Sequence, residues 1–260
     1  MSALPWLQSL LAGLRQYPQT VRQQSVARTL LQLAGTLLGL VLLYQLWLFL
    51  WVCWYSIFNP WSSAIMNQQQ AILARQNPPV PIRHEWVDYA QISSNLKKAV
   101  IASEDANFVA HQGIEWDAIR QAWRYNTAQS DKGRNKIRGG STISQQLAKN
   151  LFLSNDRSYL RKGQELIITF MLETVMSKER ILELYLNLAE WGTGIFGAQA
   201  ASQHYYKTNA NKLSQKQAAQ LAVLLPNPRV YGANIGSRYV QSRTRTIQAR
   251  MKSAQIPDTP

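Results

Sequence analysis

The chain has 260 residues, enough for one large domain or two small ones with a substantial hydrophobic core. It carries 28 lysines and arginines against 14 acidic residues, so its formal net charge is +14 at pH 7. This basic excess favours anionic partners: nucleic acid, anionic lipid headgroups or phosphate-bearing substrates. The single cysteine, Cys53, excludes a disulfide framework and a thiolate metal site.

Residues 30–55 form an apolar run without a charged side chain, LLQLAGTLLGLVLLYQLWLFLWVCWY, and no charge occurs between Arg28 and Arg75. A bilayer core of about 30 Å needs roughly 20 helical residues, so this run is long enough to span it. A buried core helix is one alternative, and a cleaved signal peptide, with an apolar region of about 7–15 residues, is another. The length of the run and its aromatic C-terminal end favour a retained transmembrane helix over residues 30–55.

The flanks of this run predict its orientation and the division of the chain. Arg15, Arg22 and Arg28 precede it, and positive residues stay on the cytoplasmic side. We therefore expect the N-terminus in the cytoplasm and the bulk of the chain across the membrane. The expected parts are a cytoplasmic leader (1–29), the transmembrane helix (30–55), a stalk or linker (56–81), the main domain (82–252) and a tail (253–260).

The main domain is dominated by helical signals. Ser177 is a plausible N-cap before a helix, and Ser214 with Gln217 forms a capping-box pattern before a helix that stops ahead of Pro226. β-alternation is scarce, and Trp86–Ile92 is the best strand candidate. The sequence predicts a mainly α domain.

The first segment with catalytic potential is IASEDANFVAHQG, residues 101–113. If it is helical, Phe108 and His111 share the face of Glu104. A carboxylate beside an aromatic ring and an apolar run should have a raised pKa, as a general base or acid near neutral pH requires. The alternative is a surface pair of Glu104 and Asp105 near a helix end. His111 taken alone is an orienting or packing group.

The second segment runs from Gly139 to Phe152. Two glycines lead into hydroxyl side chains at an expected helix start, where free N–H groups favour an anion. The alternative is an ordinary capped amphipathic helix. Gln146, Lys149 and Asn150 should line one face of this helix, offering an amide, a cation and another amide.

The third segment places three cations within six residues, Arg157, Arg161 and Lys162, followed by Glu165 four residues after Arg161. The alternative is a solvated basic face, whose Arg–Glu pair would contribute only about 0.3–0.5 kcal/mol. The functional interpretation is a cluster that neutralises a phosphate-rich group, with Lys149 as its fourth cation. A fourth segment, Lys178–Tyr206, has glycines between helical pieces that indicate a tight turn or close backbone approach, and we assign most of it to scaffold.

These segments, taken in order, resemble the peptidoglycan glycosyltransferases: the transglycosylase domains of class A penicillin-binding proteins and their monofunctional relatives. The family's blocks are Glu-Asp-x-x-Phe-x-x-His-x-Gly, Gly-Ser-Thr-Ile-x-Gln-Gln-x-x-Lys-Asn, Arg-Lys-x-x-Glu and Lys-x-x-Ile-Leu-Glu-x-Tyr-Leu-Asn. They occur at Glu104–Gly113, Gly140–Asn150, Arg161–Glu165 and Lys178–Gly197, with a looser fifth block near Ala219–Pro228. Each block alone is weak, but their joint occurrence in order is specific.

The resemblance implies a lysozyme-like helical head with a smaller membrane-associated jaw. It implies lipid II as substrate and β-1,4 chain extension with release of undecaprenyl pyrophosphate. By the same resemblance Glu104 and Glu165 are the catalytic carboxylates, and Asp105, Phe108 and His111 support them. The residues implied to bind substrate or pyrophosphate are Ser141, Thr142, Gln146, Lys149, Asn150, Arg157 and Arg161. No cofactor is required, although Mg²⁺ or Mn²⁺ near Glu165 is a metal site to test.

Two other functions remain open from the sequence. One is a lysozyme-like glycan-cleaving enzyme, against which the cation cluster speaks because a hydrolase has no pyrophosphate to neutralise. The other is a basic, membrane-anchored scaffold for cell-wall proteins without catalysis. The expected partners are lipid II, the growing lipid-linked glycan, the membrane and other cell-wall or division proteins, with no nucleic acid. The expected location is the bacterial inner membrane, with the catalytic domain in the periplasm.

Overall fold

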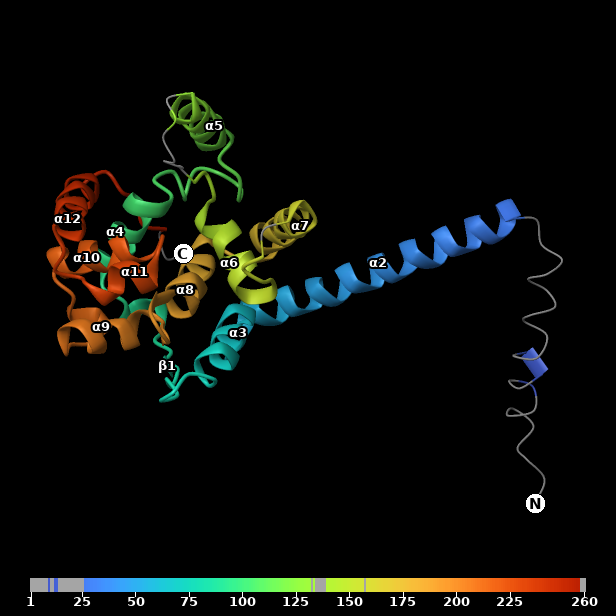
Figure 1. Ribbon diagram of the computed structural model, residues 1–260, viewed down its shortest axis with the longest axis horizontal. Coiled ribbons are helices and arrows are strands. Elements are labelled where there is room, and N and C mark those ends of the chain that lie inside the picture. Colours follow the sequence, from blue (N-terminus) through green and yellow to red (C-terminus); the bar gives the residue numbers. More distant parts are fainter. Residues whose placement is uncertain are drawn as a thin grey trace, which may run out of the picture. The chain divides into compact units, whose positions relative to one another are not determined.

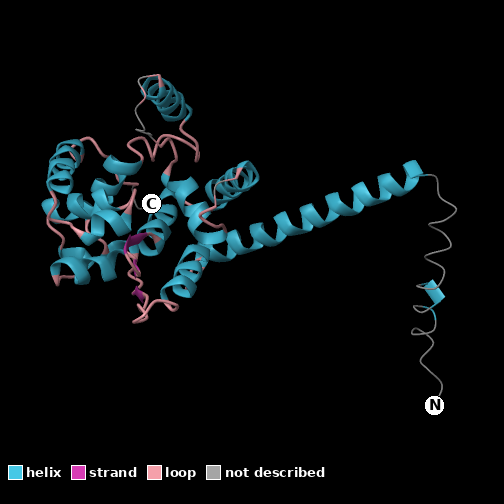
Figure 2. Ribbon diagram, viewed as in Figure 1, coloured by secondary structure: helices cyan, strands magenta, loops and turns pink. Residues whose placement is uncertain are grey.

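The computed structural model describes residues 26–131, 133, 139–156 and 158–257, together with residues 9, 12 and 13. The chain divides into two compact units, Met1–Trp51 and Val52–Pro260, and each is described by itself. Helices dominate both, and the strands are short (Figure 2). The prediction of a mainly α protein is confirmed.

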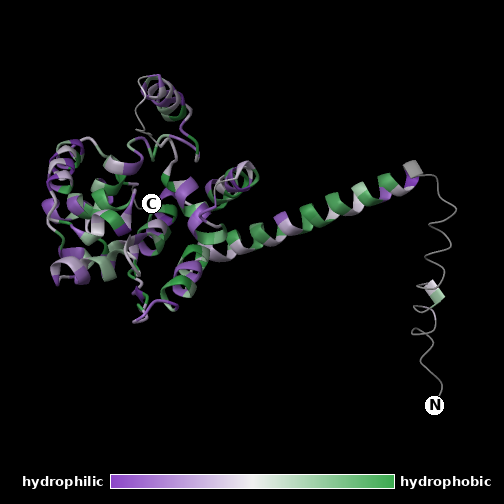
Figure 3. Cartoon of the chain, in the orientation of Figure 1, coloured by the Kyte–Doolittle hydropathy of each residue, from purple (hydrophilic) through white to green (hydrophobic). Residues whose placement is uncertain are grey.

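Helix α2 (Val26–Ile57) forms most of the described part of the first unit and continues into the second. Its 32 residues correspond to about 48 Å at 1.5 Å per residue, more than a bilayer core requires. Apolar side chains surround it along most of its length (Figure 3), and Leu31 is 73% exposed. Among the described residues it is the one helix long and apolar enough to cross a membrane. The predicted span of residues 30–55 lies within it.

The second unit is a bundle of shorter helices (Figure 1). Helix α6 packs against α3, α7 and α8, and α10 packs against α4 and α12. Helix α8 lies at the centre of the unit, since seven of its eleven residues are buried. The helices are α3 (Ala64–Leu73), α4 (Ser94–Glu104), α5 (Trp116–Ser130), α6 (Ile143–Phe152), α7 (Tyr159–Val175), α8 (Lys178–Leu188), α9 (Ala198–Tyr206), α10 (Gln215–Leu224), α11 (Pro228–Ala233) and α12 (Arg238–Arg250), with 3-10 turns η1 (Tyr89–Gln91) and η2 (Ala210–Lys212).

Side-chain caps begin several of these helices. Ser177 caps α8 by accepting from the backbone N–H of Arg180, as its sequence position predicts. The predicted capping box of Ser214 and Gln217 begins α10. A second capping box, formed by Thr142 and Gln145, begins α6. Each box satisfies N–H groups that the helix itself leaves free.

A three-stranded sheet in the order β1-β3-β2 lies beside α9. Strand β1 (Arg83–His84) pairs parallel to β3 (Ile195–Phe196), which pairs antiparallel to β2 (Glu190–Gly192). The glycines of this region mark a close backbone approach, as the sequence indicates. Gly197 has φ +83°, and a Cβ there would lie 2.8 Å from the carbonyl oxygen of Asn187.

The prediction of a strand over Trp86–Ile92 is wrong, because η1 lies within this segment. Side chains of α8 take the backbone N–H groups that a strand would give to a neighbouring strand. Asn187 Oδ1 accepts from the N–H of Val87 (3.0 Å), and Glu183 Oε1 accepts from that of Tyr89 (2.7 Å).

Candidate active site

Glu104 is the last residue of α4 and is partly exposed. Its carboxylate accepts hydrogen bonds from Gln146 Nε2 (3.0 Å) and Ser103 Oγ (3.1 Å). Burial raises the pKa of Glu104 above its ordinary value, and these two hydrogen bonds and the positive charge of Arg243 oppose that rise. A carboxylate with a raised pKa and neutral hydrogen-bond donors can accept a proton near neutral pH.

Asp105 ends α4 and turns the chain, with φ −160° and ψ 77°. The segment is therefore helical only as far as Glu104, and Phe108 and His111 do not continue its helical face. The reason is tertiary: Asp105 Oδ2 accepts from the backbone N–H of Ile143 (3.0 Å), the first residue of α6. Its buried carboxylate ties the loop after α4 to the N-terminus of α6, where negative charge is favourable.

His111 orients Asp105 from the other side. Its Nε2 lies 2.8 Å from Asp105 Oδ1, and its Nδ1 accepts from the backbone N–H of Gly113 (3.1 Å). Because Nδ1 accepts, Nε2 carries the proton and donates it to the carboxylate. Phe108 is fully buried, and the ammonium of Lys178 lies 4.6 Å from the centre of its ring. Phe108 therefore packs in the core, and His111 orients Asp105.

Helix α6 brings an amide to Glu104 from 42 residues further along the chain. Gln146 donates through Nε2 to Glu104 and accepts through Oε1 from the hydroxyl of Tyr185 on α8 (2.9 Å). Glu104 and the tyrosine hydroxyl together fix the direction of the amide, because an ionised carboxylate can only accept and takes the nitrogen end, which leaves the oxygen end of Gln146 to the hydroxyl proton. Tyr185 is fully buried, and burial raises its pKa well above the ordinary value, so it remains a donor.

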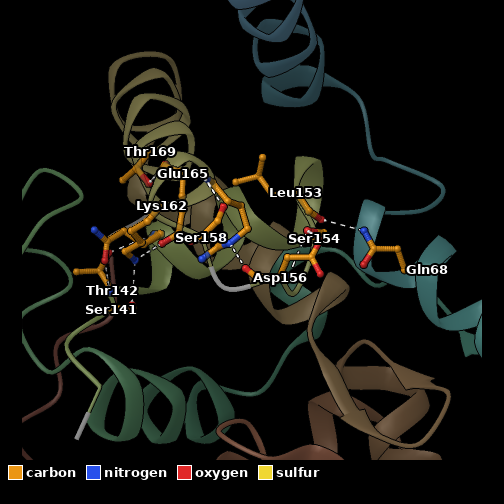
Figure 4. Close-up of polar contacts among 12 residues, drawn as sticks. Gln68, Ser141, Thr142, Leu153, Ser154, Asp156, Ser158, Lys162, Glu165 and Thr169 are labelled. Atoms are coloured by element: carbon orange, nitrogen blue, oxygen red, sulfur yellow. Dashed lines mark hydrogen bonds and ion pairs between the residues drawn. The ribbon is translucent and has the colours of Figure 1, made fainter.

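Glu165 on α7 has very different surroundings (Figure 4). It is buried, one oxygen accepts from Arg161 Nη1 (2.6 Å), and the other accepts from Lys162 Nζ. The same Lys162 ammonium donates to Ser141 Oγ (3.3 Å), which precedes α6. The Arg161 side chain is 18% exposed, so this is not the solvated surface pair that the sequence left open.

A cavity of about 300 Å³ lies over this cluster. Its polar wall includes Ser141, Gln146, Lys149, Arg161, Lys162 and Glu165. Burial lowers the pKa of Lys149, Glu165 opposes this effect, and the charges of Arg161 and Lys162 add to it. The cavity lining holds these three cations against the carboxylates of Glu165 and Asp156, so positive charge is in excess and the cavity favours an anionic ligand.

A larger cavity of about 640 Å³ shares Gln146 and Lys149 with the first. Its lining also includes Asn150, Tyr185 and the ion pair of Glu190 with Arg229. Arg229 Nε and Nη2 lie 3.2 and 3.3 Å from the two oxygens of Glu190. The smaller cavity thus gathers three cations and two carboxylates, whereas the larger one has amides, the Glu190–Arg229 pair and the shared Lys149.

The structure was tested for a divalent-cation site at Glu165, as the sequence suggests. Each oxygen of Glu165 already accepts from a cationic side chain, and Lys149 shares the cavity. A hard divalent cation prefers several oxygen ligands without neighbouring positive charge. The residues around Glu165 therefore do not fit a divalent cation.

Most of the predicted site residues lie in or beside these two cavities. Thr142 differs: it is buried, caps α6, and donates its hydroxyl to the carbonyl of Gly113 (2.6 Å), so its position favours a structural role. Arg157 lies outside the described residues. Sequence reasoning assigned Tyr185 to scaffold and did not consider Glu190, Arg229 or Arg243, because none stands in a polar motif near Glu104.

Fold and site together define a mainly helical enzyme domain in which Gln146 links the carboxylate of Glu104, whose pKa is raised, to a cavity lined by Lys149, Arg161 and Lys162. The family profile described as Transglycosylase matches residues 69–252. The biosynthetic peptidoglycan transglycosylase of Bordetella pertussis is 55% identical over 238 residues, covering 92% of this chain and 98% of that protein. The protein of that name from Herminiimonas arsenicoxydans is 56% identical over 218 residues, covering 84% and 93%. That from Methylobacillus flagellatus is 50% identical over 225 residues, covering 86% and 96%.

The chain belongs to the transglycosylase family. The resemblance inferred from the ordered sequence blocks is confirmed by these matches.

Proposed function

We propose that this chain polymerises lipid II into linear β-1,4 glycan strands of peptidoglycan, by inverting glycosyl transfer with release of undecaprenyl pyrophosphate. Family membership and the names of the relatives support glycan-strand synthesis. The observation that carries the chemistry is the pairing of Glu104, whose pKa is raised by burial, with the cation-lined cavity over Lys149, Arg161 and Lys162. A glycan-cleaving enzyme needs the carboxylate but has no use for the cations.

Glu104 acts as the general base. It takes the proton of the acceptor's 4-hydroxyl while that oxygen attacks the anomeric carbon of the donor. The bond from the anomeric carbon to the phosphate oxygen breaks in the same displacement, so the configuration inverts. Gln146 donates to Glu104, and Tyr185 fixes the amide, so the carboxylate is held in place before substrate binds.

The cation cluster stabilises the departing pyrophosphate. Lys149 and Arg161 bind its oxygens, together with Lys162 and, by sequence resemblance, Arg157. Glu165 holds Arg161 and Lys162 in position, since it accepts from both. Glu165 fixes the positions of Arg161 and Lys162 before the reaction, so little reorganisation of these two is needed when charge develops on the leaving group.

The remaining predicted residues have supporting roles. Asp105 and His111 hold the N-terminus of α6, and thereby Gln146 and Lys149, against the end of α4. Ser141 and Asn150 contact substrate oxygens, since each lines one of the two cavities.

The membrane places the enzyme beside its lipid-linked substrate. We propose that α2 spans the bacterial inner membrane with the N-terminus in the cytoplasm, and that the catalytic unit faces the periplasm. Exposed apolar side chains on α5 and α7, including Trp123 (75% exposed) and Leu160 (89% exposed), suit the membrane-associated jaw.

The test is to incubate the purified full chain in detergent or liposomes with lipid II and to follow both products. The expected result is a glycan polymer together with released undecaprenyl pyrophosphate. A protein that leaves lipid II intact but shortens preformed glycan would be a hydrolase instead. A protein that binds lipid II without consuming it would be a scaffold.

A further inference from the structure

The larger cavity has one wall from α3, the helix that follows the membrane segment. Gln69 of α3 lines this cavity together with Lys149 and Asn150. The side chain is only 4% exposed, and its Oε1 is buried without a hydrogen-bond partner among the described residues. Gln69 lies outside the sequence segments with catalytic potential, and the proposed mechanism gives it no role.

An unpaired buried carboxamide oxygen is unusual, because buried polar groups in folded proteins nearly always have partners. Its neighbours on α3 behave in the expected way. Gln68 donates to the carbonyl of Leu153 at the end of α6 (3.4 Å; Figure 4), and Gln70 is exposed to solvent. Of these three glutamines, Gln69 is the one that is buried with an unpaired amide oxygen. An unpaired buried amide oxygen destabilises the folded state, so we expect its hydrogen-bond partner to be a ligand.

The chemistry of the cavity indicates which ligand. Besides Gln69, its polar wall has further amides, the Tyr185 hydroxyl and the ion pair of Glu190 with Arg229, and it shares the ammonium of Lys149 with the smaller cavity. Amides, hydroxyls and ion pairs exchange hydrogen bonds with hydroxyl and acetamido groups, which act as both donors and acceptors. The cationic side chains Arg161 and Lys162 line only the smaller cavity. The amide-rich larger cavity therefore suits an amino sugar, and the smaller cavity, where Arg161 and Lys162 join the shared Lys149, suits the pyrophosphate.

We propose that the Gln69 carboxamide binds the amino-sugar part of the substrate in the larger cavity, accepting a hydrogen bond from one of its N–H or O–H groups. This inference rests on the proposed function and adds a binding residue from outside the catalytic segments. Rotation of the terminal amide presents either its oxygen or its nitrogen to the sugar.

Helix α3 is placed well for this role. The Ser63 hydroxyl caps its N-terminus by accepting from the N–H of Met66 (3.2 Å), and Gln68 attaches it to the end of α6. Helix α6 itself carries Gln146 and Lys149, so Gln69 is held in a fixed relation to the residues around the reacting atoms.

The experiment compares the full-length variants Gln69→Met and Gln70→Met with the parent in a lipid II polymerisation assay. Methionine keeps the length and helix propensity of glutamine but cannot form the hydrogen bond. We expect Gln69→Met to lower kcat/KM roughly tenfold, the loss of one neutral hydrogen bond, with a melting temperature equal to or above that of the parent. Gln70→Met should match the parent in both. Gln69→Glu, which keeps an acceptor, should recover part of the lost kcat/KM.

A second measurement identifies the part of the substrate concerned. Undecaprenyl pyrophosphate, which lacks the sugars, should inhibit Gln69→Met and the parent equally. If undecaprenyl pyrophosphate instead inhibits the variant more weakly than the parent, by the same factor by which kcat/KM falls, Gln69 acts on the pyrophosphate and the sugar assignment is overturned. A fall in melting temperature that accompanies the loss of activity, or failure of the variants to fold, would make Gln69 structural and overturn the proposal. If the parent polymerises lipid II and Gln69→Met keeps its kcat/KM, this inference fails while the proposed function stands; if the parent does not polymerise lipid II, the proposed function fails.

Discussion

Two glutamates of the catalytic unit, Glu104 and Glu165, illustrate how surroundings divide one residue type between two roles. Among the described residues, the Glu104 carboxylate accepts from the neutral groups of Gln146 and Ser103, and burial raises its pKa. Glu165 accepts from Arg161 at one oxygen and from Lys162 at the other. The hydrogen-bond donors of the first carboxylate are neutral, and those of the second are cationic. The surroundings of each side chain, more than its place in the sequence, separate the proposed base, Glu104, from Glu165, which positions the cations.

The two regions are joined by α6. Gln146 faces Glu104, and Lys149, one turn further along the helix, shares the smaller cavity with Glu165. In the proposed mechanism, one helix therefore serves both proton removal at the acceptor and charge development on the leaving group. The experiments below separate the two halves of the site.

The largest effect is expected from Glu104→Gln, which removes the proposed proton acceptor and keeps the shape of the side chain and one of its two acceptor oxygens. We expect glycan synthesis to fall by about 1,000-fold or more, since a general base contributes roughly 10²–10⁴. The measurement is lipid II consumption by protein of unchanged membrane insertion and helicity. Glu85→Gln, at an exposed position, is the matched control. Synthesis near the parent rate in Glu104→Gln would remove Glu104 from its assigned role.

The second-largest effect is expected at Lys149, which lines the smaller cavity with Arg161 and Lys162. Lys149→Met keeps the apolar stem and removes the charge beside the leaving pyrophosphate. We expect kcat to fall by about 100-fold, by analogy with the loss of one preorganised charge-stabilising group. Lys216→Met, on the exposed side of α10, should leave kcat unchanged. An unchanged kcat with a raised KM in Lys149→Met would show instead that Lys149 binds ground state and transition state equally.

A modest effect is expected from Tyr185→Phe, which acts on Glu104 through Gln146. Without the hydroxyl, the amide is free to rotate and present its oxygen to Glu104, so the hydrogen bond that lowers the pKa of Glu104 is weakened. The pKa of Glu104 should rise further, and the acid limb of the pH profile of kcat/KM should move to higher pH. Activity at neutral pH should fall a few-fold. Tyr206→Phe removes a similar bond, to Gln220 Oε1 (2.9 Å), and should leave the profile unmoved. An acid limb that stays in place in Tyr185→Phe would argue against this coupling.

The subtlest effect is on stability. The ordinary pKa of the Glu104 carboxyl is 4.5, and its pKa in the folded protein is higher. Between these values the folded state binds more protons than the unfolded state, so stability falls as pH rises through this window. Glu104→Gln does not titrate. It should therefore unfold at higher denaturant concentration than the parent at neutral pH, and the difference should disappear below about pH 4.5. A difference that did not change with pH would contradict the desolvation of Glu104.

The sequence was a good guide to features set by neighbours along the chain. The pair of Arg161 and Glu165 forms as its spacing predicts, because residues four apart meet on one helix face. It was a poor guide where a distant partner decides the backbone. Asp105 gives its carboxylate to Ile143 and ends α4 at Glu104, and α8 takes the N–H groups of the segment around Tyr89 that had been expected to form a strand.

The contact of Arg180 with the end of α2 shows the same limit. Its guanidinium donates to the carbonyls of Tyr55 (3.0 and 2.9 Å) and Phe58 (2.9 Å), more than 120 residues earlier. The last carbonyls of a helix carry the negative end of its dipole, so a cation there is favourable. Nothing in the local pattern around Arg180 predicts it, because the pattern is that of an ordinary Arg180–Glu183 helix pair.

The sequence by itself determined the apolar helix, the helix caps, the ordered motifs and hence the family, because each depends on periodicity or on residues close along the chain. Only the tertiary structure decided that Gln146 stands between Glu104 and Tyr185, that Lys162 serves both Glu165 and Ser141, and that Gln69 of α3 lines the larger cavity. The physical reason is that hydrogen bonds and desolvation depend on atoms brought together by packing. Those atoms come from helices dozens of residues apart, and no spacing in the sequence records which of them meet.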